Sequence, residues 1–124
     1  MKYILLMSGT RAGVEGYHAW PKKDIDAHMA VLHRINQEIA ESGEFVTTQG
    51  LTEPKEAKVV RGEKDGLPVT DGVFPESKEF LLGYWIVDVA NAERAYAIAG
   101  RISAVSRNMP IEVRQFASYE AKSQ

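Results

Sequence analysis

Three histidines are the first candidates for acid–base chemistry in this chain: His18, His28 and His33. An imidazole titrates near neutral pH, so one that is held by a carboxylate can act as a general acid or base. His28 falls within the apolar arc of a predicted helix and His33 at the edge of that arc, whereas His18 lies in a predicted loop. We therefore take His28 and His33 as catalytic candidates. The alternative is that each only fills space and bonds to backbone.

A cluster of charges that leads into the most apolar run of the chain is the second candidate. Asp71 and Gly72 form a turn dipeptide, and Glu76, Lys78 and Glu79 then crowd the start of the next strand. On one interpretation they form the polar rim of a cleft, with Asp71 or Glu76 as a base and Lys78 binding an anion. On the other they form a rigid turn tied by side-chain-to-backbone bonds of Asp71 and a surface ion pair, which residue chemistry alone favours.

A glycine-punctuated stretch from residue 9 to residue 20 separates the first strand from the first helix. Its glycines are spaced G-x-x-x-G-x-x-G, which is neither the dinucleotide-binding pattern nor a phosphate-binding P-loop. We interpret the stretch as a flexible connection in which Arg11 could contact an anionic ligand.

Several classes of site are excluded by composition and spacing. The chain has no cysteine, and its His28 and His33 are five residues apart, which places them about 140° apart around a helix, too far to share a metal. We predict no metal and no cofactor. A net charge of −2 with scattered charges argues against nucleic-acid binding. The first apolar run is too short for a signal peptide or membrane span, so we expect a cytoplasmic protein.

The elements that must position these residues follow the order β-α-β-hairpin-β-α-β. Two strands are apolar on both faces and therefore belong in the middle of a sheet. A glycine at position 43 ends the first helix, and an asparagine at position 91 caps the second. The predicted strands are residues 2–8, 44–50, 79–89 and 110–117, the hairpin strands are 56–62 and 67–70, and the helices are 21–42 and 91–107.

This order is the ferredoxin-like βαββαβ (split βαβ) pattern of α+β proteins, with an inserted β-hairpin. We expect one domain over residues 1–124, with an antiparallel sheet and two helices on one face. The other face, with a share of Leu81, Trp85 and Val87, then needs a cover. A second copy packing sheet to sheet would supply it, giving a homodimer. The alternative is that the hairpin and the 9–20 stretch fold over that face.

Residues 71–79, DGVFPESKE, closely resemble the D-G-P-F-x-E-x-K-E signature of the YCII-related (DGPF-domain) family. The opening MKYILLM and residues 83–89 are also similar to strands of that family, while Val73 stands where its signature has proline. The resemblance implies a ferredoxin-like fold that dimerises through its sheet. Most members have no established activity, although some accompany extracytoplasmic sigma factors. One branch is thought to use a His–Asp pair, and one relative is a dehydrochlorinase. The histidine of that branch corresponds to Leu32, the neighbour of His33.

Two functions remain open for this small dimeric protein, and neither involves nucleic acid or a membrane. The first is a non-catalytic accessory or regulatory module, in which residues 71–79 are purely structural. The second is a cofactor-free enzyme of the elimination or isomerisation type, with Asp71 and either His28 or His33 as its acid–base pair. It would act on a small anionic or aromatic ligand, contacted by Lys78, Glu76, Glu79 and Arg11.

Overall fold

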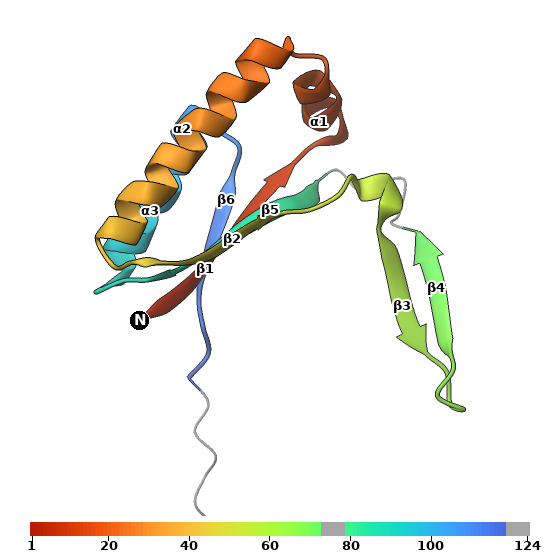
Figure 1. Ribbon diagram of the computed structural model, residues 1–124. Helices are drawn as coiled ribbons and strands as arrows, with labels where there is room; N and C mark the ends of the chain where they lie inside the picture. The colour runs from red at the N-terminus through yellow and green to blue at the C-terminus, as the bar shows by residue number, and fades with distance from the viewer. Residues whose placement is uncertain (73–78, 119–124) are drawn as a thin grey trace, which may run out of the picture.

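A computed structural model describes residues 1–72 and 79–118 of the chain (Figure 1). It is a mixed α+β structure. Its elements, in chain order, are β1 (Lys2–Gly9), α1 (Arg11–His18), α2 (Lys22–Glu41), β2 (Phe45–Gly50), a short 3-10 helix η1 (Pro54–Glu56), β3 (Lys58–Gly62), β4 (Pro68–Gly72), β5 (Phe80–Asp88), α3 (Ala92–Val105) and β6 (Ile111–Gln115).

The main sheet has four strands in the order β2-β5-β1-β6, and every neighbouring pair is antiparallel. The two strands that are apolar on both faces, β1 and β5, occupy the middle, as predicted. This order is compatible with the ferredoxin-like arrangement. The predicted hairpin is also confirmed: β3 and β4 form a separate two-stranded sheet, which extends away from the helical layer in Figure 1.

The long helices begin and end where the sequence indicates. Gly43 follows α2 with a φ of +81°, the left-handed conformation that glycine adopts at a helix end without strain. Asn91 caps α3, because its side chain accepts a hydrogen bond from the backbone N–H of Arg94 at 2.9 Å. Both helices lie on one face of the sheet (Figure 1). In the part of the chain that the structure describes, no helix is long and apolar enough to cross a membrane.

The prediction of a loop between residues 9 and 20 is wrong, because α1 lies within it. Gly13 and Gly16 lower the helix propensity of this segment, which hid the helix in the sequence. Thr10 supplies the signal that was missed: its hydroxyl accepts a hydrogen bond from the N–H of Gly13 at 3.0 Å and caps the helix. Among the described residues, α1 therefore joins α2 and α3 on the helical side of the sheet (Figure 1).

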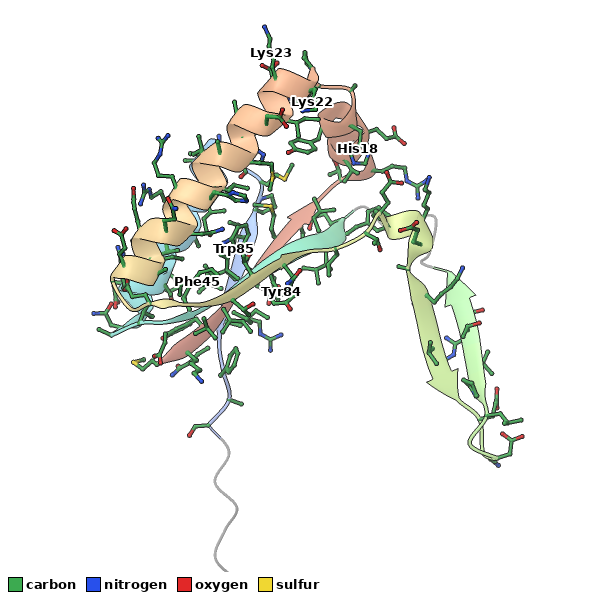
Figure 2. The ribbon with its side chains drawn as sticks, viewed as in Figure 1. His18, Lys22, Lys23, Phe45, Tyr84 and Trp85 are labelled. Carbon is green, nitrogen blue, oxygen red and sulfur yellow. The ribbon has the colours of Figure 1, made fainter. Side chains whose placement is uncertain are left out.

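An irregularity in the central pair of strands decides which side chains face the helices. Met7 pairs with Gly83 and the next residue, Ser8, pairs with Leu81, so Leu82 is an extra residue on β5. This extra residue puts Leu81 on the opposite face from Trp85 and Val87. Trp85 and Val87 are buried under the helices, so the expectation that they share the other face with Leu81 is wrong. Figure 2 shows Trp85 on the helical side of the sheet and Tyr84 on the opposite side.

The opposite face of the sheet, which we call the open face, is apolar and only partly buried. Neither α1 nor the hairpin lies across it in Figure 1, so the alternative cover considered from the sequence is wrong. Leu81 is 44% exposed there. The other apolar side chains of the open face are Ile4 and Leu6 on β1 and Tyr84 and Ile86 on β5.

Candidate functional site

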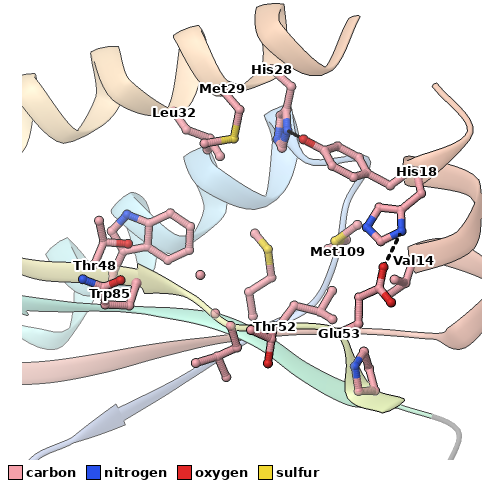
Figure 3. A pocket seen from close by; sticks show the side chains of 18 of the residues that line it. Val14, His18, His28, Met29, Leu32, Thr48, Thr52, Glu53, Trp85 and Met109 are labelled. Atoms are coloured by element: carbon pink, nitrogen blue, oxygen red, sulfur yellow. Dashed lines mark hydrogen bonds and ion pairs between the residues drawn. The ribbon is translucent and has the colours of Figure 1, made fainter. Parts of the chain in front are cut away.

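A pocket of about 380 Å³ lies between the helices and the end of the sheet (Figure 3). Helix α2 forms its roof, and strands β2 and β5 form its floor. Helix α1 and the segment after β2 close one end, and Trp85 closes the other. The residues that line it include His28, Met29 and Leu32 from α2, Val14, Tyr17 and His18 from α1, Thr48–Pro54 after and along β2, and Leu82, Gly83 and Trp85 from β5.

The walls of the pocket are mainly apolar. Three methionines from three different segments, Met7, Met29 and Met109, contribute thioether side chains. Among the described residues that line the pocket there is no lysine or arginine, and Glu53 is the carboxylate. The indole N–H of Trp85 donates to the side-chain oxygen of Asn36 at 2.9 Å, which fixes the ring plane. The pocket therefore suits a molecule with a large apolar surface.

Two glycines leave the floor without side chains. Gly50 on β2 pairs with Gly83 on β5. A Cβ atom at Gly50 would meet nothing within 4 Å, whereas a Cβ atom at Gly83 would lie 2.9 Å from the backbone oxygen of Gln49. A glycine within a strand often marks a place where a ligand or another backbone approaches closely. Here the backbone of β2 leaves no room for a side chain at Gly83, whereas a side chain at Gly50 would enter free space.

A histidine–carboxylate pair lies at the α1 end of the pocket (Figure 3). Nδ1 of His18 lies 3.1 Å from Oε1 of Glu53, and both side chains are partly exposed. The second oxygen of Glu53 lies 3.2 Å from Nζ of Lys55. Because Glu53 engages Nδ1, Nε2 of His18 is the nitrogen that remains for a bound molecule. The sequence analysis missed this pair, since His18 was placed in a loop and no local spacing connects it with Glu53.

His28 forms the partition between this pocket and a second hollow of about 330 Å³. Nδ1 of His28 lies 3.1 Å from the hydroxyl of Tyr17, and Nε2 lies 3.0 Å from Oγ of the buried Ser106. Burial lowers the pKa of His28, and burial, followed by the charge of Asp26, raises the pKa of Tyr17. Both groups are therefore uncharged at neutral pH. Since protein groups engage both nitrogens, His28 is suited to holding α1 in place.

The other residues that the sequence analysis selected do not converge on one site. His33 lies at the edge of the pocket and is exposed. Asp71 lies on β4 of the hairpin, where its carboxylate forms an ion pair with Arg61. It is not among the residues that line the pocket, so the structure does not bring it to His28 or His33.

The predicted ligand-binding residues are also dispersed. Glu76 and Lys78 lie outside the described residues. Glu79 borders the second hollow, together with His28 and Ser106. The guanidinium of Arg11 lies 5.7 Å from the centre of the Phe80 ring and lines a third hollow of about 310 Å³ rather than the main pocket. Within residues 1–72 and 79–118, no group of three or more histidine, aspartate or glutamate side chains could hold a metal ion.

The profile of the YCII-related domain matches residues 1–117, nearly the whole chain. The chain belongs to the YCII-related domain family. A relative of this YCII-related protein occurs in Rhizobium meliloti (strain 1021) and is described as uncharacterized. The two are 29% identical over 103 residues, which cover 82% of this chain and 83% of the relative. The family resemblance expected from residues 71–79 is thus confirmed, and neither comparison names an activity.

Proposed function

We propose that this YCII-related protein is a homodimer that binds a small organic molecule in the pocket between α1, α2 and the sheet. One observation carries the proposal: a mainly apolar pocket of about 380 Å³, with Trp85 at one end and hydrogen-bonding groups at its rim. Ligand pockets are usually concave, mostly apolar and about 300–1,000 Å³ in volume, with a few polar groups that orient the ligand. A protein that binds such a molecule without transforming it would have the accessory or regulatory role. A cytoplasmic location stays a prediction.

Binding is tested with N-phenyl-1-naphthylamine, an uncharged dye whose fluorescence rises in apolar surroundings. We expect saturable binding to the wild type. Gly50→Leu should abolish it, because the new side chain enters free space in the pocket. Gly62→Leu is the matched control: Gly62 is also a strand glycine with nothing within 4 Å of its Cβ position, but it lies on the hairpin. Equal binding by the wild type and both variants would contradict the proposal.

The dimer is supported by the open face of the sheet. Ile4, Leu6, Leu81, Tyr84 and Ile86 form an apolar surface on the two central strands, and contiguous apolar surfaces of this kind usually mark an interface. A two-fold axis that lies between two facing open faces would bury the same residues on both copies. We expect light scattering after size-exclusion chromatography to give twice the monomer mass. Tyr84→Glu should give monomers, whereas Val60→Glu on the exposed hairpin should not. A monomeric wild type would contradict this part of the proposal.

A cofactor-free acid–base enzyme is the second candidate, and the contact between His18 and Glu53 favours it. Glu53 would hold Nδ1–H of His18 and stabilise the imidazolium that forms when Nε2 accepts a proton. The sequence-derived candidates His28, His33 and Asp71 lie in different surroundings, and their catalytic roles stay predictions.

The enzyme candidate is tested with 5-nitrobenzisoxazole, a flat molecule that undergoes elimination when a base removes its C3 proton. The proton would pass to Nε2 of His18 while the N–O bond breaks, leaving a nitrile and a coloured phenolate. We expect a saturable rate above that of buffer, which His18→Gln abolishes and Glu53→Gln lowers. His33→Gln, at the rim of the same pocket, should keep the rate. A rate that survives His18→Gln would exclude this base.

A further inference from the structure

We propose that the ligand of the pocket is a flat, uncharged ring system that lies on the bare backbone of Gly50 and Gly83. This inference rests on the proposed binding function and adds the chemical class of the molecule. The shape of the pocket floor and the charges of the pocket walls support this inference independently.

The floor of the pocket is flat where the two glycines lie. The preceding pair on the same face, Thr48 and Trp85, lies two positions from the glycines and lines the pocket. At Gly50 and Gly83 both side chains are absent at once, so two neighbouring strands present peptide planes over a continuous area. Met29 and Leu32 face this area from α2 (Figure 3). A planar ring can contact peptide groups below and methyl or thioether groups above along its whole area, whereas a globular molecule cannot.

Of the two glycines, Gly50 gives the stronger evidence for a ligand. Gly83 has a reason within the fold, because any side chain there would collide with the backbone oxygen of Gln49 at 2.9 Å. No neighbouring atom imposes the same limit at Gly50, where a Cβ would meet nothing within 4 Å and φ is not in the positive region. A β-branched or aromatic residue would suit an edge strand better than glycine. The fold does not require glycine at this position, but a ligand in contact with the backbone does.

The walls of the pocket offer few charged partners to a bound ion. Removing a charged group from water is costly unless a partner replaces its hydration. Among the described residues that line the pocket there is no lysine or arginine to receive an anion. The carboxylate of Glu53 is engaged by His18 and Lys55, which reduces its attraction for a cation. Arg11 and Lys55 line the third hollow instead, on the other side of His18 and Glu53.

The composition of the walls fits a ring in particular. Sulfur atoms of methionine make favourable contacts with aromatic rings, and Met7, Met29 and Met109 all line the pocket. The ring of Trp85 is held by Asn36 and offers an edge or face to a second ring. Nε2 of His18 lies at the other end, where it can bond to one polar substituent.

The test compares three molecules of similar size that differ in shape or in charge. 2-Naphthol is flat and uncharged at neutral pH, 2-naphthoate is flat and anionic, and 1-adamantanol is uncharged and globular. Each competes with N-phenyl-1-naphthylamine for the full-length protein. We expect 2-naphthol to bind at least about tenfold more tightly than the other two. The pocket offers no partner for the charge of 2-naphthoate, and the globular 1-adamantanol cannot contact the flat floor over its whole area.

Variants of the protein test whether the preference for 2-naphthol depends on the floor of the pocket. Gly50→Leu should weaken 2-naphthol binding at least as strongly as it weakens binding of the dye, and Gly62→Leu should leave it unchanged. Val14→Phe, which fills the pocket from α1, is a second blocking variant in case Gly50→Leu does not fold. Circular dichroism checks the fold of each variant.

Each outcome distinguishes the inference from the function on which it rests. If 2-naphthoate or 1-adamantanol displaces the dye as well as 2-naphthol does, the pocket binds ligands but the inferred class is wrong. If 2-naphthol binds equally to the wild type and both blocking variants, the floor is not its site. If neither the dye nor any of the three molecules binds, the proposed function fails as well.

Discussion

Nε2 of His28 lies 3.0 Å from Oγ of Ser106, and this contact joins α2 to the end of α3. Ser106 is only 2% exposed and is the buried polar residue of the described core. The other nitrogen of His28 lies 3.1 Å from the hydroxyl of Tyr17 on α1. One imidazole therefore connects three helical segments, and α1 in turn forms a wall of the pocket. Two predictions follow from the position of this ring.

Ser106→Ala should lower the free energy of unfolding by about 1–2 kcal/mol, since it leaves a nitrogen of His28 without its partner in a partly buried place. Urea unfolding monitored by tryptophan fluorescence measures the change. Ser118→Ala, at an exposed position, is the control and should have no effect. Equal stability of the two variants would show that water replaces the serine hydroxyl.

The stability of the protein should fall between about pH 7 and pH 5, because His28 has a folded-state pKa below its unfolded value of about 6.5. Below 6.5 the unfolded chain binds a proton at this position that the folded chain binds less readily, so acid favours unfolding. NMR titration should place the midpoint of His28 below that of a free imidazole. Unfolding of His28→Gln should depend less on pH over the same interval. A midpoint at or above 6.5 would contradict the burial of this ring.

Asp71→Asn should leave the NMR titration midpoint of His28 unchanged. The carboxylate of Asp71 pairs with Arg61 within the hairpin, and it does not line the pocket. Binding of N-phenyl-1-naphthylamine should also be unaffected. A shift of that midpoint in this variant would revive the pairing of Asp71 with a histidine that was considered from the sequence, and would require the hairpin to move toward the helices.

Gly83→Ala should destabilise the protein by about 1–3 kcal/mol, because its methyl group would lie 2.9 Å from the backbone oxygen of Gln49 and would force β2 and β5 apart. Gly50→Ala, at the opposite position of the same strand pair, should be neutral or slightly stabilising, since its methyl group enters free space. Thermal unfolding of both variants measures the difference. The reverse order of stability would mean that the floor of the pocket is not built as described.

Much of the fold could be predicted from local patterns. Runs that are apolar on both faces identified β1 and β5 as the central strands, because only a covered strand can bury both faces. Gly43 and Asn91 marked helix ends, since a positive φ and a capping side chain depend on the residue itself. The signature at residues 71–79 indicated the family that the comparison confirms over residues 1–117. Each of these features depends on residues close together in the chain.

The candidate site was decided only by the tertiary structure. The extra residue Leu82 on β5 put Leu81 on the opposite face from Trp85, and no alternation pattern reveals such a bulge. His18 meets Glu53 because α1 folds against the segment after β2, and Asp71 is removed from the histidines because the hairpin extends from the sheet. The physical reason is the same in each case. Contacts between distant segments depend on how packed elements are placed, and that placement minimises exposed apolar area over the whole chain rather than within any single stretch.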